Sequence, residues 1–517
     1  MSSKITYILL FFIVVLAGFL RFYKLDKVPI SLNWDEVAAG YNAYTIANWG
    51  ADEYGNKLPI TFKSFGDDKH PVHIYLTSVI VKIFGSNDFT TRAGSALVGS
   101  LSVLAIYYLV KKLTEDETAA IFASLFMAVS SYSIHFSRGL WEANFALFFF
   151  ILGFALFYKN IPLSLVSFGL SFFSYHSAKI VVPPIVFLLF VLNFKKIIKD
   201  KKVLLVSLIV VMVFSILIIK DPRILGFARV GQTKFSTEQI QKYGGVAKLY
   251  FSNYKQYFSY NYLFVKGDQN PRGSVKVIGQ FYKIDFILGI IGILGLISKK
   301  KLRALSLILV WLALAPIPAA LSSTDTNATR TIFLIGPIII LSAFGASTII
   351  NGAKQKWLKA LSVLVILIFL SLEVNNYLKY YFTEYNTKEA IEWQYGMKDI
   401  VGFVNDNPEY YRVYMDKIRQ QPYIFFLYYL KVPLPELLST VKYDEGESKS
   451  YNTVLSFDKY RFGNWNIIDS YPNEGILYVI TPSYYGGLRY LQQFDVNKVI
   501  KYPDNSDAFY IVSGHNQ

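Results

Sequence analysis

Long apolar runs recur along the chain and alternate with short charged segments. A helix needs roughly 20 mostly apolar residues to cross the hydrocarbon core of a bilayer. About eleven stretches approach that length, namely 5–23, 90–110, 117–134, 143–158, 161–175, 178–194, 203–220, 284–298, 304–321, 331–350 and 358–378. This pattern predicts a polytopic α-helical membrane protein with about eleven transmembrane helices.

Lysine-rich loops indicate how these spans are oriented. The first run has the length of a span rather than of a signal-peptide core, so we expect it to be retained. With an inside N-terminus, the short segments that share one side are KKLTEDET, KKIIKDKK, SKKKLR and NGAKQKW. Because short loops rich in Lys mark the cytoplasmic side, we expect 24–89, 221–283 and 379–517 on the outer side. The expected location is a prokaryotic plasma membrane.

The long outer segments have patterns of their own. EVAAGYNAYTIANWG and HPVHIYLTSVIVKIFG place apolar residues at helical spacing, which predicts interfacial helices in the first outer loop. After about residue 379, KEAIEWQYGMKDIVGFVND and QPYIFFLYYLK predict helices, whereas YYRVYMD and GILYVITP predict strands. We therefore expect a transmembrane domain over 1–378, with outer loops at 24–89 and 221–283, and a small extracytoplasmic α/β domain over 379–517.

Composition agrees with a membrane protein and excludes several classes of site. Hydrophobic residues make up 53% of the chain and charged residues 17%, and the mean hydropathy is +0.35. The chain has no Cys, which excludes disulfides, thiolate metal ligands and Cys nucleophiles. The net charge of +16 does not indicate nucleic-acid binding, because many lysines lie in short clusters between apolar runs.

The first outer loop is rich in carboxylates. We expect four of them to be solvated loop charges: Asp26, Asp52, Glu53 and Asp88. Asp35 and Glu36 differ, because they open a helix-like run where the helix dipole favours an acid. The stretch FGDDKHP brings Asp67, Asp68, Lys69 and His70 together just before a helix that starts with Pro. Mixed acids and bases at a membrane surface suit phosphate binding beside a catalytic carboxylate.

Further charged groups lie at the outer ends of later spans. In SIHFSRGLWEANF, Arg138 and Glu142 either share a helix face as a simple ion pair or project into an outward cavity. In SYHSAKIVVPP, Lys179 either snorkels to the headgroups or binds a lipid phosphate, with His176 nearby. Other cations at outer span ends are Arg92 in FTTRAGSAL and Arg330 in STDTNATRTIFLIGP.

Cations near the headgroup plane, with carboxylates beside them, suit one kind of chemistry. Arg and Lys hold a lipid-linked phosphate, and an Asp or Glu accepts a proton from an attacking hydroxyl or amine. A sugar on a lipid phosphate is already activated. An enzyme that uses it therefore needs a base, a charge that stabilises the departing phosphate, and correct positioning.

The stretches that carry these residues resemble a known family when they are taken in order. They are NWDEVAAGYNAY, GADEYGNKLPITFKSFGDDKHPVHIYL, TRAGSALVGSL, FSRGLWEANFALFFF, SYHSAKIVVP and ATRTIFLIGPIIILSAFGA. The chain resembles GT-C superfamily membrane glycosyltransferases, of the branch with protein O-mannosyltransferases and the lipid A aminoarabinose transferase. The resemblance implies a GT-C fold and an inverting transfer of a sugar from a polyprenyl-phosphate donor to a protein, lipid or glycan acceptor on the outer face. It marks the domain over 1–378 as catalytic.

The resemblance also implies roles for single residues. Asp35 matches the acid usually assigned as catalytic base, with Glu36 beside it, and Glu142 matches an acidic position where related enzymes often carry Asp. The implied contacts to the donor's lipid phosphate are Lys69, Arg92, Arg138, His176, Lys179 and Arg330. Further first-loop candidates are Asp68 and His70. No metal ligand set is assigned, although a carboxylate pair could hold a divalent cation through water.

Two other classes stay open. A glycan polymerase or ligase would act on lipid-linked oligosaccharide through a large late loop, and 221–283 contains the basic stretch DPRILGFARVGQTKF. The acid-rich first loop argues against that reading. A transporter of lipid-linked sugars would place ionisable residues near mid-membrane and show repeated halves, and the spans carry few charges at mid-depth.

Overall fold

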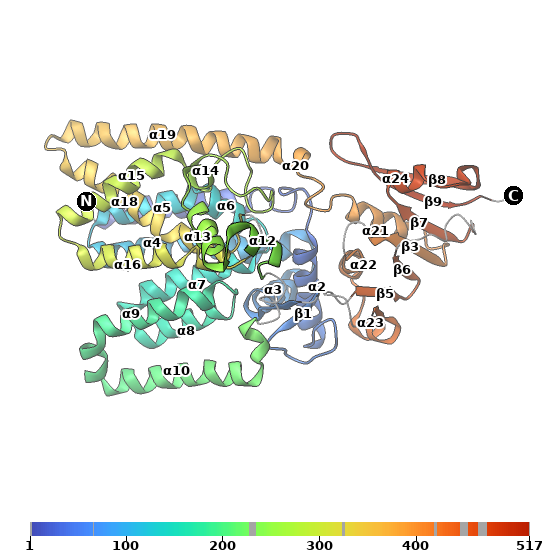
Figure 1. Ribbon diagram of the computed structural model, residues 1–517, viewed down its shortest axis with the longest axis horizontal. Helices are drawn as coiled ribbons and strands as arrows, with labels where there is room; N and C mark the ends of the chain where they lie inside the picture. Colours follow the sequence, from blue (N-terminus) through green and yellow to red (C-terminus); the bar gives the residue numbers. More distant parts are fainter. Residues whose placement is uncertain are drawn as a thin grey trace. The chain divides into compact units, whose positions relative to one another are not determined.

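A computed structural model describes residues 3–65, 67–226, 234–322, 326–417, 421–444, 453–463 and 473–515. These residues form two compact units, shown with their elements in Figure 1. Unit 1 comprises 1–23, 70–73 and 94–381, and unit 2 comprises 24–69, 74–93 and 382–517. Unit 2 therefore combines most of the first loop with the whole C-terminal segment.

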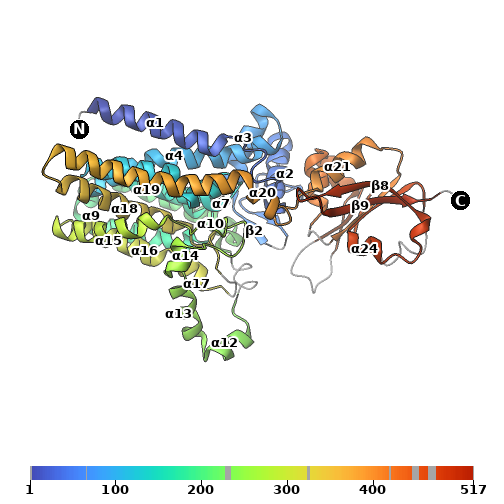
Figure 2. The same ribbon diagram turned by 90° about the horizontal axis from the view of Figure 1, so that it is seen from above.

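Unit 1 is a bundle of apolar helices. Its elements are α1 (Ser3–Phe22), most of α4 (Asp88–Thr114), α5 (Glu117–Val129), α6 (Ser131–Ser137), α7 (Glu142–Phe157), α8 (Ile161–Phe172), α9 (Ala178–Lys199), α10 (Lys201–Lys220), η1 (Pro222–Leu225), α12 (Thr237–Tyr243), α13 (Val246–Gln256), α14 (Tyr260–Phe264), α15 (Lys283–Ser298), α16 (Leu302–Leu314), α17 (Ile317–Ala320), η2 (Ile332–Leu334), α18 (Ile335–Gly352) and α19 (Lys356–Thr383). Figure 2 shows α12 and α13 standing away from the long helices. Each of the predicted apolar stretches is helical.

The helices that form the eleven predicted stretches differ in length. Within the described residues, seven helices are long and apolar enough to cross a membrane, or eight if α5 and α6, which meet at a 54° bend, form one span. The three other predicted spans, α7, α8 and α15, are shorter helices of 16, 12 and 16 residues. The chain is an integral membrane protein with many apolar helices.

Burial separates central from peripheral helices in unit 1. The α18 span is 89% buried, whereas the α10 span is only 6% buried, so apolar side chains of α10 are left to face lipid. At the centre, α15 and α18 cross closely through Gly292 and Gly345, where a Cβ on either glycine would overlap the backbone of the other helix. Small residues at such crossings permit close packing between spans.

Unit 2 contains a seven-stranded mixed sheet with the order β4-β5-β6-β3-β7-β9-β8. Its strands are β3 (Arg412–Asp416), β4 (Lys442–Asp444), β5 (Thr453–Phe457), β6 (Tyr460–Gly463), β7 (Ile476–Ile480), β8 (Phe494–Lys501) and β9 (Asp507–Gly514). The central strand β3 pairs in parallel with β6 and β7, and the remaining pairs are antiparallel. The short helices of this segment are α20 (Tyr385–Lys388), α21 (Met397–Asp406), α22 (Tyr423–Tyr429), α23 (Leu434–Thr440) and α24 (Pro482–Gly486). The predicted α/β fold of the tail is confirmed.

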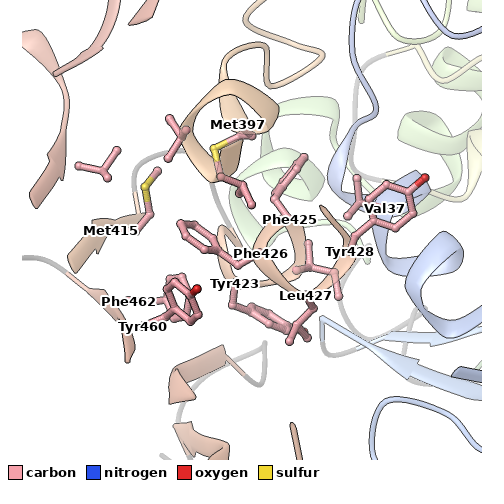
Figure 3. Packing of buried hydrophobic residues seen from close by; sticks show 14 of the residues in the cluster. Val37, Met397, Met415, Tyr423, Phe425, Phe426, Leu427, Tyr428, Tyr460 and Phe462 are labelled. Carbon is pink, nitrogen blue, oxygen red and sulfur yellow. The ribbon is translucent and has the colours of Figure 1, made fainter. Parts of the chain in front are cut away.

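The first loop contributes helices and a hairpin to unit 2. They are α2 (Trp34–Trp49), the hairpin β1 (Phe62–Ser64) and β2 (Asp67–Lys69), and most of α3 (Pro71–Phe84). Nine of the 16 residues of α2 are buried. Figure 3 shows Val37 of α2 in one apolar cluster with α21, α22 and the strands, including Met397, Phe426 and Phe462. The sequence predicts α2 as a helix but not this packing against residues more than 350 positions away.

Candidate active site

The N-terminus of α2 is held by a capping box that fixes the position of Asp35. The Asn33 side chain accepts hydrogen bonds from the N–H groups of Asp35 and Glu36, and the Glu36 carboxylate accepts one from the N–H of Asn33. The N–H of Trp34 donates to Oε1 of Gln394 at 2.9 Å. Both acids therefore lie in the first helical turn, as predicted, but only Asp35 has a partly exposed side chain, at 30%.

Glu36 forms a buried ion pair with Arg92 at the start of α4. Nε of Arg92 lies 2.8 Å from Oε1 of Glu36, a second guanidinium nitrogen lies 3.0 Å from Oε2, and both side chains are fully buried. The ring of Trp393 lies 5.6 Å from the guanidinium carbon. The remaining N–H groups of Arg92 donate to backbone carbonyls of Leu25, Pro29 and Ser31. This network fixes the loop before α2 and engages Arg92 entirely within the protein.

Asp35 is paired with Lys69. Nζ of Lys69 lies 2.9 Å from Oδ1 of Asp35, and the two side chains are 20% and 30% exposed. Lys69 ends β2, where it pairs with Phe62 of β1. Successive strand residues point to opposite faces, so Asp68 faces away from Lys69. The structure thus brings Asp35 and Lys69 together, 34 positions apart in sequence, and leaves Asp68 out of this pair.

Lys179 is the centre of a second group, which lies in unit 1. Its Nζ is 2.7 Å from Nε2 of His70 and 3.2 Å from Nδ1 of His176. An ammonium group only donates, so both ring nitrogens accept and each imidazole carries its proton on the other nitrogen. The Nδ1–H of His70 then faces Oε2 of Glu142, 3.9 Å away. His70 and His176 therefore both contact the side-chain nitrogen of Lys179, and Glu142 lies beside His70 at ion-pair rather than hydrogen-bond distance.

A glycine missed by sequence reasoning completes this group. Gly226 follows η1 with a φ of +78°, and a Cβ there would lie 2.3 Å from Nδ1 of His176 and 3.3 Å from Nζ of Lys179. Glycine adopts this left-handed conformation without strain and leaves room for both side chains. The only available signal was the Gly in DPRILG, which by itself also fits an ordinary turn.

Arg138 has a different environment from the one expected. Arg138 caps the C-terminus of α6 and Glu142 begins α7, so the two do not share a helix face, which was the first of the two alternatives. The Arg138 side chain is fully buried and donates to the carbonyls of Leu20, Arg21 and Tyr23 at the end of α1. The last predicted cation, Arg330, lies in the turn before η2 and is 9% exposed.

Three first-loop acids that were expected to be solvated are buried. Asp52 is 1% exposed, Glu53 2% and Asp88 8%, whereas Asp26 is exposed. Asp52 accepts hydrogen bonds within the turn that follows α2, from Tyr54 N–H and Asn56. Burial of Glu53, together with the neighbouring charge of Asp52, raises the pKa of its carboxyl to about 8. Asp52 and Glu53 are buried rather than solvated because the C-terminal segment covers this turn within unit 2.

No three His, Asp or Glu side chains converge as a metal ligand set within the described ranges. His70 and His176 instead contact the side-chain nitrogen of Lys179, and Glu142 lies beside His70.

The chain shares its fold with two solved membrane proteins, ArnT from Cupriavidus metallidurans and the Archaeoglobus fulgidus oligosaccharyltransferase. A crystal structure of ArnT from Cupriavidus metallidurans in the apo state superposes with a TM-score of 0.55 at 13% identity, covering all of both chains. The same protein bound to undecaprenyl phosphate gives 0.54 at 12% identity, again covering all of both chains. The Archaeoglobus fulgidus oligosaccharyltransferase in complex with Zn and sulfate gives 0.52 at 14% identity, covering 97% of this chain and 72% of the other.

Sequence comparison supports the same resemblance over part of the chain. The family model described as dolichyl-phosphate-mannose-protein mannosyltransferase matches residues 68–219. That range contains Lys69, His70, Glu142, His176 and Lys179. No curated protein sequence matches the chain at a significant level.

Proposed function

We propose that this protein is a glycosyltransferase that moves a sugar from a polyprenyl-phosphate donor to a hydroxyl or amine of an acceptor on the outer face of the membrane. The observation that carries the proposal is the lysine ammonium of Lys179, held by His70 and His176 beside Glu142. These residues lie in the range matched by the mannosyltransferase family. A relative with the same fold, ArnT, binds undecaprenyl phosphate, which supports a donor of that class.

The proposed reaction is an inverting substitution at the anomeric carbon. The acceptor oxygen or nitrogen forms a bond to that carbon while the bond from the carbon to the phosphate oxygen breaks. The acceptor proton passes to the carboxylate of Asp35, and the electron pair leaves with the polyprenyl phosphate. Attack on the face opposite the phosphate inverts the anomeric configuration. No other reactant is needed.

Asp35 suits the role of base because it is partly exposed and fixed at both ends. The Asn33 cap holds its backbone, and Lys69 holds its carboxylate at 2.9 Å. Lys69 has three N–H donors, so it can hold Asp35 and a phosphate oxygen together. Within unit 1, Lys179 offers a positive charge suited to stabilising a leaving phosphate, and we assign Glu142 to orienting His70.

Burial divides the remaining candidates by role. Glu36, Arg92 and Arg138 are fully buried and bonded to groups of the protein itself. We therefore assign them to positioning the loop, α2 and the end of α1, in place of the catalytic role of Glu36 and the donor contacts of Arg92 and Arg138 that the resemblance implies. Arg330 remains a candidate contact to the phosphate or the acceptor.

An assay with purified protein and a panel of polyprenyl-phosphate sugars tests the proposal. We expect transfer from at least one donor and a loss of roughly 10²–10³-fold in rate for Lys179→Gln, because one charge that stabilises the leaving phosphate is removed. The exposed Lys159, in the turn between α7 and α8, provides the matched control Lys159→Gln. The proposal fails if no donor in the panel supports transfer, or if Lys179→Gln transfers at the wild-type rate.

A glycan polymerase or ligase is the second candidate. It is favoured by one observation, a cavity lined mostly by residues of the long loop 221–283, several of which carry amide or hydroxyl side chains. Such an enzyme uses the same donor chemistry and differs in that its acceptor is itself a saccharide.

A further inference from the structure

A cavity of about 290 Å³ opens in unit 1 where α13 ends and α14 begins. Most of the side chains in its wall carry an amide, a hydroxyl or an ammonium group, namely Gln256, Ser259, Asn261, Lys266, Gln269 and Thr326. The aromatic ring of Tyr262 and Gly267 complete the wall. Among the described residues that line it there is no aliphatic side chain and no carboxylate. The wall therefore suits neither a lipid chain nor a metal ion.

One side of the cavity is held rigidly. Oγ1 of Thr326 donates to Oδ1 of Asp268 at 3.1 Å and accepts the N–H of Gln269 at 3.3 Å. Asp268 is 2% exposed and also accepts the N–H of Ala328. Burial raises the pKa of Asp268 to about 6. A buried carboxylate beneath Thr326 fixes this wall before any ligand arrives, which reduces the ordering cost of binding.

The opposite side presents amides to solvent. Gln256 is the last residue of α13 and Asn261 belongs to α14, and both side chains are exposed. Within the described part of the chain neither side-chain amide makes a hydrogen bond to the protein. Ser259 caps α14 by accepting the N–H of Tyr262. The cap of α14 is thus supplied by Ser259, and the side-chain amides of Gln256 and Asn261 are available to a ligand.

From this wall we propose that the cavity binds a saccharide unit of the acceptor. Sugar hydroxyls both donate and accept hydrogen bonds, and amides and hydroxyls do the same. The volume lies at the lower end of the range for ligand pockets, which fits one sugar residue rather than an oligosaccharide. Lys266 is the one formal charge of the wall, so a sugar with a carboxylate binds at least as well as a neutral one. The part of the inference that names the acceptor rests on the proposed function.

Saturation-transfer NMR on the full-length protein tests binding directly. The protein is placed in lipid nanodiscs, free of sugar-based detergent, and the probes are glucose, galactose, mannose, N-acetylglucosamine and glucuronate. We expect at least one probe to bind to the wild type and to the control Gln241→Leu, which changes an exposed amide of α12 outside the cavity. The double variant Gln256→Leu/Asn261→Leu loses about fivefold in affinity per lost hydrogen bond, about 25-fold together.

The outcomes separate this inference from the proposed function. The inference is overturned if no probe binds, or if the double variant binds as the wild type does. In a transfer assay we expect the double variant to raise the KM for the acceptor and to leave the KM for the donor unchanged. If the KM for the acceptor stays unchanged as well, the cavity does not bind the acceptor. If sugar binding depends on both amides while no donor supports transfer, the cavity is a sugar site and the proposed function is what fails.

Discussion

Glu53 is buried in unit 2, and its carboxyl has a pKa well above that of a carboxyl in water. Its side chain is 2% exposed, and burial raises its pKa from 4.5 to about 8. Its N–H donates to Oδ1 of Asn42 at 3.0 Å, but its own Oε1 has no hydrogen-bond partner within the described residues. Substitution by Gln keeps the size and removes the ionisation, so Glu53→Gln isolates the cost of this buried acid.

The sign of the effect follows from the two pKa values. Below pH 4.5 the carboxyl is protonated in the folded and unfolded states, and the folded state has its full stability. As the pH rises from 4.5 to about 8, the unfolded state loses the proton and the folded state keeps it, so stability falls. Above about pH 8 both states are ionised and the loss stops growing. A difference of 3.5 pKa units at 1.36 kcal/mol each is about 5 kcal/mol.

Thermal unfolding followed by tryptophan fluorescence measures this loss. We expect the Tm of Glu53→Gln to rise relative to that of the wild type as the pH increases from about 5 to about 8, by about 10 °C or more for a unit of this size. The exposed Glu436 of the same unit gives the control Glu436→Gln, whose Tm difference stays constant. A difference for Glu53→Gln that is flat over this range, or that shrinks, refutes the account of its burial.

Three further substitutions test the packing around the candidate site and in the bundle. Gly226→Ala drives a Cβ into His176 and abolishes most transfer activity, whereas Gly244→Ala has a similar φ of +70° but no site residue nearby and stays active; equal activity of the two would contradict the role of Gly226. Arg92→Met leaves Glu36 charged and unpaired, which lowers the free energy of unfolding by about 3–5 kcal/mol in a denaturant titration, and adding Glu36→Met restores much of that loss; a double variant as unstable as the single one would count against the ion pair as the cause. Gly292→Ala lowers the Tm because its Cβ overlaps the backbone of α18, and Gly289→Ala on the same helix, with open space around it, does not; equal Tm values would argue against the close crossing.

Periodic patterns predicted the elements of this protein because they are local. The apolar runs, the helix opened by Asp35 and the helix begun by Pro71 all depend on residues close in sequence. The lengths of single spans were harder to predict, since α7, α8 and α15 are apolar but have only 16, 12 and 16 residues. The α/β tail followed from alternation in YYRVYMD and GILYVITP.

Burial and pairing were not predictable from local pattern. Arg92 and Glu36 are 56 positions apart in sequence. The backbone carbonyls that accept the other hydrogen bonds of Arg92 occur at every residue, so the sequence does not mark them. Glu53 was expected in water as a charge of the first outer loop, but residues of the C-terminal segment cover it in unit 2. The need for glycine at Gly226 appears only once His176 is in place.

The central claim is that Asp35 accepts the proton of the acceptor. Its most direct test is the single-turnover transfer rate of Asp35→Asn against Asp26→Asn, an exposed acid of the same loop. We expect a fall of roughly 10²–10⁴-fold for Asp35→Asn, with donor affinity unchanged, and a wild-type rate for Asp26→Asn. Full transfer by Asp35→Asn on a donor that the wild type uses would contradict the account.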